Sequence, residues 1–349
     1  MTTNPQKRES NFELLRIFAA MAVVTLHFNY IYPSGGALAN ARGSTYNVLL
    51  FFETLSICAV NLFILLSGYF GCNSRSIKVG KLLKLLLQTI CISCITKIIS
   101  SMIHHQWDLK EILASFIPAN YYVVLYISLM LIAPFINKLI DSLSQRSFRN
   151  LIILVFLLFS VYSIAVDILK EITDKSWSGL SSIGIDGSMN GYSIINFILV
   201  YLIGVWLRKK EFTSKASVTV LISVLIGCIV ALIGWRRFLP KTAWAYNNPL
   251  VILEACLIFL LFGKIRLTSK LVNALAPASF TCYLIHGSII VALDKRISIS
   301  HSLPEALALL FVIAIGIFLI SFMIMKIWEI IIVLTQKKIV KRIPNIQVD

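Results

Sequence analysis

Charged side chains are scarce in this sequence, and acidic ones are the scarcest. Only 14% of the 349 residues are charged, and 16 aspartates and glutamates stand against 32 lysines and arginines. Soluble domains carry about 25% charged residues, so this chain has too few to cover itself with a polar surface. Hydrophobic residues reach 58% and occur in long runs, which predicts a protein that faces lipid.

The sequence also lacks the patterns of a metal centre and of a nucleic-acid-binding domain. Cys91 and Cys94 form a C-x-x-C pair with no second pair and no histidine nearby, so we interpret them as packing residues of one helix. The net charge of +16 comes from short basic tracts between apolar runs, which is typical of loops beside anionic lipid. We therefore expect a lipid bilayer as partner, no nucleic acid and no metal. The oligomeric state stays open.

The apolar runs define the fold class. A transmembrane helix needs about 20 mostly apolar residues. The runs are Phe12–Tyr30, Val48–Phe70, Leu82–Ile103, Tyr121–Ile140, Leu151–Ile168, Tyr192–Leu207, Ser217–Trp235, Pro249–Gly263, Pro277–Leu293 and Pro304–Leu334. They predict an all-α integral membrane protein: one domain over residues 1–349, a bundle of about ten transmembrane helices, and short tails at about 1–11 and 335–349.

Lysines and arginines are concentrated in every second connection between these runs. If the N-terminus lies inside, the cytoplasmic connections contain the basic tracts at 7–8, 75–84, 138–149, 208–215, 264–270 and 337–342. Fewer basic residues then lie outside. The positive-inside rule therefore favours two cytoplasmic termini and an even number of crossings.

Two basic side chains interrupt the first run, NFELLRIFAAMAVVTLHF. Arg16 and His27 are eleven positions apart, which is three helical turns plus about 20°, so both share one face. The rise between them is about 16 Å, or roughly half of the hydrocarbon core. Arg16 therefore belongs near the cytoplasmic end, where Glu13 can pair with it, and His27 nearer the outer side. The alternative is a snorkelling arginine and an interfacial histidine.

Other polar side chains enter the second and ninth runs. Glu53 and Asn61 are expected to face the bundle interior, and Glu53 is a candidate to orient the His27 imidazole unless it is a loop-edge glutamate in water. In the ninth run, Tyr283 and His286 either contact substrate or are structural. Intramembrane polar groups are costly, so they mark the places where chemistry is expected.

Ser67-Gly68-Tyr69 lies near the cytoplasmic end of the second run. Gly68 permits close approach of another helix, and Ser67 can hydrogen-bond across an interface. A serine nucleophile would need a base, and His27 is expected at the other side. The motif therefore has either a packing role alone or a catalytic one.

These segments resemble the acyltransferase-3 family, membrane enzymes that acylate carbohydrates and other acceptors. Arg16–x10–His27 is similar to the family's first-span signature, and AVNLFILLSGYF to its second-span motif. The segments YYVVLYISLMLIAPFIN, GYSIINFILVYLIGVWLRKK and SFTCYLIHGSII resemble its fourth, sixth and ninth spans. The resemblance covers about Asn11 to Leu334, and the chain is most similar to the versions found in bacterial surface-polysaccharide clusters.

Three positions depart from the family pattern. Tyr122 stands where tryptophan is expected, and Lys81 and Lys84 stand where many members carry Arg-x-x-Arg. Lysine keeps the positive charge but loses the two-pronged guanidinium that binds phosphate. These lysines are therefore either donor-binding residues or ordinary positive-inside lysines.

The resemblance implies a membrane O-acyltransferase of the bacterial plasma membrane. It would move an acetyl group from acetyl-CoA, or another acyl group from its CoA thioester, to a hydroxyl of a cell-surface or exported polysaccharide or of its lipid-linked precursor. A flippase, polymerase or transporter of surface-glycan intermediates is the alternative, because intramembrane charges also mark ion paths. For catalysis we expect His27 as the general base, with Arg16 and Glu53. The residues expected to bind the donor are Arg16, Lys81, Lys84, Ser67, Gly68 and Tyr69. Those expected on the acceptor side are Asn61, Tyr283 and His286.

Overall fold

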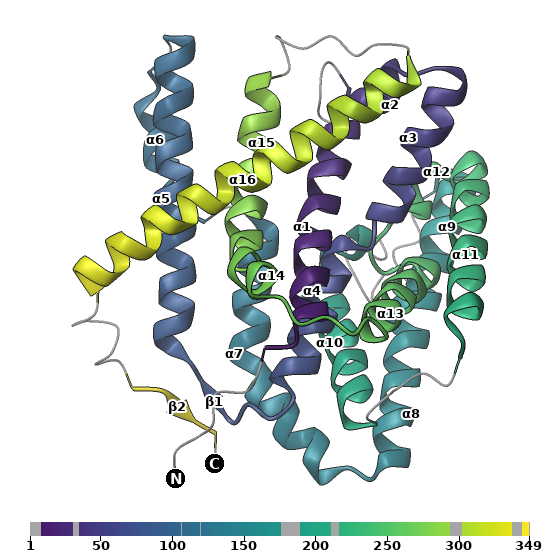
Figure 1. Ribbon diagram of the computed structural model, residues 1–349. Coiled ribbons are helices and arrows are strands. Elements are labelled where there is room, and N and C mark those ends of the chain that lie inside the picture. The colour runs from purple at the N-terminus through teal and green to yellow at the C-terminus, as the bar shows by residue number, and fades with distance from the viewer. Residues whose placement is uncertain are drawn as a thin grey trace.

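The computed structural model describes residues 8–30, 35–105, 107–118, 120–175, 189–210, 216–293, 302–336 and 344–348. Within these ranges the protein is almost entirely helical, as Figure 1 shows. Each apolar run forms helix. Seven helical segments of the described chain are long and apolar enough to cross a membrane, and Pro249–Gly263 and Ala278–Leu293 are shorter apolar helices. The all-α membrane class is therefore confirmed, and the number of crossings stays a prediction.

The helices follow one another along the chain in the order of their numbers. The first half contains α1 (Ser10–Tyr30), α2 (Ala37–Asn40), α3 (Gly43–Ser56), α4 (Ala59–Gly71), α5 (Val79–His104), α6 (Leu109–Ala114), α7 (Tyr121–Ser142), α8 (Gln145–Phe156), the π-helical turn η1 (Leu157–Tyr162) and α9 (Ser163–Thr173). The second half contains the 3₁₀ turn η2 (Met189–Gly191), α10 (Ile194–Lys209), α11 (Val218–Phe238), α12 (Pro240–Ala243), α13 (Pro249–Gly263), α14 (Lys270–Leu275), α15 (Ala278–Leu293) and α16 (Leu303–Gln336).

Helix α1 occupies the middle of the bundle. It packs against α3, α4, α13, α15 and α16, so residues on its different faces meet different partners. Helix α16 runs obliquely across the other helices in Figure 1. Its 34 residues correspond to about 51 Å of helix, which is longer than the hydrocarbon core and fits an oblique path.

The closest helix crossing joins α4 to α10. Gly68 and Gly204 face each other there: a Cβ atom on Gly68 would lie 2.2 Å from the Tyr201 carbonyl oxygen, and one on Gly204 would lie 2.4 Å from the Leu65 carbonyl oxygen. Small residues at such crossings let two helix backbones touch. The close approach expected from Gly68 is therefore present.

Two predicted runs differ from a single regular helix. The second run is broken into α3 and α4 at Ile57–Cys58, just after Thr54, whose hydroxyl donates 2.8 Å to the Leu50 carbonyl, a bond that bends helices. The fifth run contains η1, where the Phe159 carbonyl accepts a hydrogen bond from the Asn247 amide (3.0 Å). A side chain from elsewhere in the chain therefore stabilises this π-helical turn.

The basic connections gather at one end of the bundle. Arg208 pairs with Glu9 at the start of α1, Lys209 pairs with Asp141 at the end of α7, and Arg75 also pairs with Asp141. The Arg75 carbonyl accepts a hydrogen bond from the Val348 amide (3.0 Å). The start of α1 and residues 346–348 therefore lie at the same end of the bundle, and the even number of crossings stays a prediction. Lys7, Lys215 and the tract at 337–342 lie outside the described residues.

The expected C-terminal tail contains a strand that sequence reasoning did not predict. Residues Ile346–Gln347 form β2, which pairs antiparallel with β1 (Ser76–Ile77), directly before α5. Two residues are too short for an alternating pattern to be recognised in the sequence.

We predict that this basic end is cytoplasmic. Cysteines introduced by Lys78→Cys or Lys210→Cys should react with a membrane-impermeant maleimide only after the cells are permeabilised, because basic loops stay inside. Lys175→Cys, beyond α9, is the control that should react in intact cells. Reaction of Lys78→Cys or Lys210→Cys in intact cells would reverse the orientation.

Candidate active site

A pair of histidines from two helices forms the centre of the site. His27 near the end of α1 and His286 on α15 have ring centroids 4.4 Å apart in an edge-to-face arrangement. His286 is buried, with 6% of its surface exposed, and His27 is partly buried. The first and ninth apolar runs, which were separate candidates in the sequence, are therefore joined in one site.

Both imidazoles are oriented by their own helices. His27 Nδ1 lies 2.9 Å from the Val23 carbonyl oxygen, and His286 Nδ1 lies 3.1 Å from the Cys282 carbonyl oxygen. A carbonyl oxygen only accepts, so in each neutral ring Nδ1 carries the hydrogen and Nε2 keeps the lone pair. The Nε2 atom of His286 is buried and has no hydrogen-bond partner among the described residues. The site therefore holds two imidazoles whose basic nitrogen is available for a proton.

Glu53 reaches the site through a residue that sequence reasoning missed. It is buried on α3 and accepts a 2.9 Å hydrogen bond from Asn29, which also donates to the Leu49 carbonyl. Positions 27 and 29 differ by about 200° around a helix. Asn29 therefore faces α3, whereas His27 faces α15. Glu53 was expected to contact His27 directly. Its carboxylate instead bonds Asn29, and this hydrogen bond holds the last turn of α1 in place.

Arg16 lies on the same unbroken helix as His27, so the stripe predicted from their spacing is retained. Its guanidinium bonds the Glu13 carboxylate at 2.5 Å and lies 5.3 Å from the centre of the Phe70 ring on α4. The pairing with Glu13 is the one expected from the sequence. The side chain is 31% exposed, so the charge is fixed by these neighbours and remains accessible.

The Ser67-Gly68-Tyr69 motif lies beside this arginine. Ser67 donates its hydroxyl hydrogen to the Phe63 carbonyl one turn earlier (2.8 Å), and Gly68 forms the α4–α10 crossing. The Tyr69 hydroxyl accepts a 3.1 Å hydrogen bond from Arg208 of α10. Ser67 and Gly68 therefore have packing contacts, and Tyr69 brings a second arginine to the same end as Arg16.

A hollow of about 420 Å³ opens at the start of α1. It is lined by Arg8, Glu9, Asn11 and residues 265–268, which include Arg266. Glu9 is the residue that pairs with Arg208. The start of α1 thus combines a recess with several guanidinium groups.

Lys81 and Lys84 lie in the first two turns of α5. Lys81 is exposed and Lys84 is partly exposed, and within the described chain neither ammonium group is paired. The strand β1, directly before them, packs against α7 and β2. The structure therefore leaves their charges free at the basic end and brings them into none of the contacts around Arg16.

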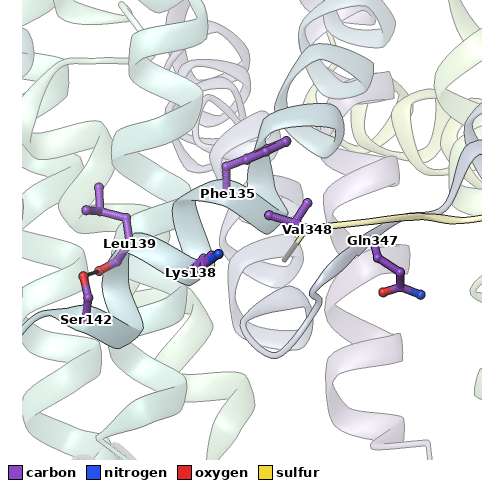
Figure 2. A pocket seen from close by; sticks show the side chains of 6 residues that line it. All are labelled: Phe135, Lys138, Leu139, Ser142, Gln347 and Val348. Carbon is purple, nitrogen blue, oxygen red and sulfur yellow. Dashed lines mark hydrogen bonds between the residues drawn. The ribbon is translucent and has the colours of Figure 1, made fainter.

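A second hollow of about 400 Å³ lies at the basic end, away from the histidines. Figure 2 shows Phe135, Lys138, Leu139 and Ser142 of α7 on one side and Gln347 and Val348 on the other. Its residues belong to the end of α7 and to the C-terminal strand. The described residues that line this hollow therefore include none of those expected in the site.

Asn61 and Tyr283 are, with His286, the residues expected on the acceptor side. Tyr283 lies beside His286, and Asn61 contacts the segment before α13. The Tyr283 ring centroid is 5.7 Å from that of His286, and its hydroxyl donates to Asn120 Oδ1 at 3.2 Å. Asn61 is buried on α4 and donates to the Tyr246 carbonyl at 2.7 Å. Both residues therefore contact the loops that lead to the start of α7 and α13.

A family model described as an acyltransferase domain, that of the acyltransferase-3 family, matches residues 9–326 of the chain. The chain belongs to the acyltransferase-3 family. No curated protein and no solved structure is similar enough to match it. The matched region runs from the start of α1 into α16 and contains every expected site residue. Together with the apolar helices, it makes this protein a multi-pass membrane acyltransferase.

Two residues of this acyltransferase escaped the sequence reasoning although the sequence contained a signal for them. Asn29 is an amide inside an apolar run, two positions after His27, so the criterion that selected Glu53 also applied to it. Arg208 belongs to the motif GVWLRKK and was counted only as a loop charge. Its contact with Tyr69 depends on the α4–α10 crossing, which no local pattern predicts.

Proposed function

We propose that this membrane acyltransferase moves an acetyl group from acetyl-CoA to a hydroxyl of an exported or cell-surface polysaccharide, or of its lipid-linked precursor, in a bacterial plasma membrane. The observation that supports the proposal most strongly is the His27–His286 pair, with both Nδ1 atoms hydrogen-bonded and both Nε2 atoms basic. Acyl transfer to a hydroxyl needs such a base.

In the proposed reaction, His27 is the general base. Its Nε2 accepts the proton of the acceptor hydroxyl while the hydroxyl oxygen attacks the thioester carbonyl carbon. The carbon–sulfur bond then breaks, and the departing CoA thiolate takes the proton back from the imidazolium. Asn29 and Glu53 position the last turn of α1, and His286 packs against the imidazole edge.

The donor is proposed to enter from the basic end. Arg16, Arg208 and the recess beside Arg8 provide guanidinium groups, which suit the phosphates of CoA because each can form paired charged hydrogen bonds. Arg16 and His27 are about 16 Å apart along α1. In acyl-CoA the pantetheine arm separates the phosphates from the thioester. The proposed site uses that arm to connect the two residues.

Replacing Arg16 should weaken donor use. Arg16→Ala should raise the KM for acetyl-CoA by about 10–100-fold, because a hydrogen bond to a charged group contributes about 1.5–3 kcal/mol. Arg16→Lys should recover part of this loss, since the lysine ammonium keeps the positive charge but cannot form the paired hydrogen bonds of a guanidinium. Arg149→Ala, which removes an exposed arginine of α8, is the control and should match the wild type. Wild-type kinetics in Arg16→Ala would leave Arg16 without a catalytic role.

Thiol release tests the function itself. The purified protein should release CoA thiol from acetyl-CoA faster when glycans from cells lacking this gene are added. Mass spectrometry should find one acetyl mass fewer per modified sugar in those cells. A flippase, polymerase or transporter would consume no acetyl-CoA, so an absence of acceptor-dependent thiol release would reject the proposal.

A further inference from the structure

A group of tyrosines from four separate parts of the chain meets beside the histidine pair. We call it the tyrosine cluster: Tyr121 and Tyr122 at the start of α7, Tyr192 after η2, Tyr246 before α13, and Tyr283 on α15. Ring centroids are 4.6 Å apart for Tyr121–Tyr192, 5.1 Å for Tyr192–Tyr246 and 4.6 Å for Tyr122–Tyr283. Tyr122, where the family pattern expects tryptophan, is thus part of this cluster.

The phenol groups of the cluster lie deep in the helix bundle. Tyr122, Tyr246 and Tyr283 are buried, and the Tyr283 hydroxyl donates to Asn120 Oδ1 at 3.2 Å. A buried hydroxyl costs free energy unless it has partners. A group of buried phenols among apolar helices therefore indicates a polar site.

Three buried asparagine side chains lie beside the cluster, and within the described chain the amide oxygen of each lacks a hydrogen-bond donor. Asn61 donates to the Tyr246 carbonyl, Asn247 to the Phe159 carbonyl and Asn196 to the Gly191 carbonyl. The Oδ1 atom of each is buried and has no partner among the described residues. Unpaired buried acceptors are uncommon, so each of these oxygens calls for a hydrogen-bond donor. A molecule with several hydroxyl groups meets that need.

The cluster has an accessible edge and a direct connection to the base. Tyr192 is 43% exposed, whereas Tyr246 and Tyr283 are buried. Tyr283 lies one turn before His286 on α15, with 5.7 Å between their ring centroids, and His286 contacts His27. A ring that occupies the cluster would therefore place one of its hydroxyls near the imidazole nitrogens.

We infer that the tyrosine cluster binds the sugar ring of the acyl acceptor. Aromatic faces cover the apolar face of a pyranose, and the amide oxygens of Asn61, Asn196 and Asn247 accept hydrogen bonds from its hydroxyls. This inference rests on the proposed acetyl transfer to a glycan. It adds the residues that hold the acceptor and select a sugar hydroxyl over water.

The test separates acceptor binding from donor chemistry. The probe is the free and lipid-linked glycan extract of cells lacking this gene, added to the purified protein with acetyl-CoA. Tyr192→Ala should raise the glycan concentration for half-maximal transfer at least about tenfold, because an aromatic face that covers the sugar ring is lost together with a hydroxyl. Tyr246→Phe, which keeps the ring, should raise it less. The KM for acetyl-CoA and the acceptor-free hydrolysis of the thioester should stay unchanged in both.

Tyr126→Phe on α7, one turn beyond Tyr122, is the matched control and should behave like the wild type. Elution of each variant as a single species in size-exclusion chromatography shows that it is folded. If the wild type transfers acetyl and both cluster variants keep its glycan dependence, the tyrosine cluster is not the acceptor site. If the wild type transfers nothing to the extract, the proposed function itself fails, and the acceptor site with it.

Discussion

His27→Ala is expected to lower turnover by about 10²–10⁴-fold, the range that general-base catalysis contributes, while the protein remains in the membrane at normal levels. The side chain is partly exposed and its ring nitrogen bonds only a carbonyl of its own helix, so its removal leaves no distant partner unpaired. The measurement is acetyl transfer per molecule of purified variant. A purely structural histidine would give the reverse pattern, with low protein levels and near-normal activity per molecule.

The pH dependence of turnover is a second test of the role of His27. A protonated imidazole cannot accept a proton, so wild-type turnover should rise with pH over the range in which a histidine loses its charge. His27→Gln retains the size and a hydrogen-bonding group but has no basic nitrogen, and its profile should be flat over that range. Wild-type turnover with the same rise in His27→Gln would show that the mechanism is wrong, and His286 would be the next residue to replace.

Gly204→Val is expected to remove most of the folded protein. The new Cβ would lie 2.4 Å from the Leu65 carbonyl oxygen and 3.1 Å from the Gly68 Cα, so backbone and not a flexible side chain would have to move. Overpacking costs about 1–3 kcal/mol where side chains can adjust. At the upper value the ratio of folded to unfolded protein falls by about a hundredfold.

The matched control is Gly234→Val on α11. A Cβ at Gly234 meets nothing within 4 Å, so this variant should reach wild-type levels. The amount of monodisperse protein in a detergent extract is the measurement. Equal amounts of both variants would mean that the α4–α10 crossing does not limit folding.

Most of the architecture could be predicted from the sequence, because apolar runs of about 20 residues carry a strong and local signal. Each predicted run is helix in the structure, and the stripe from Arg16 to His27 is intact because α1 is regular. The exceptions depend on distant residues. The π-helical turn η1 is held by Asn247 from the loop before α13, and no pattern within the fifth run indicates that contact.

The site was predictable residue by residue but not as an arrangement. Intramembrane His27, Glu53, Asn61 and His286 could be selected because polar groups are costly there. Their grouping could not, because it depends on helix packing. Glu53 meets Asn29, and His27 meets His286, only because α1 presents different faces to α3 and α15. The tyrosine cluster is still less visible in sequence, since its members come from four separated segments.

The position of the two histidines near opposite ends of the chain has a consequence for biosynthesis. Chains are made and inserted from the N-terminus, and early segments fold before late ones exist. His27 belongs to the first helix and leaves the ribosome early, but its partner on α15 follows only after α14. A nascent chain therefore contains Arg16 and a lone imidazole but no histidine pair. Under the proposed mechanism, acyl transfer from CoA begins only when nearly the whole polypeptide has been inserted, which would protect the donor pool from unfinished chains.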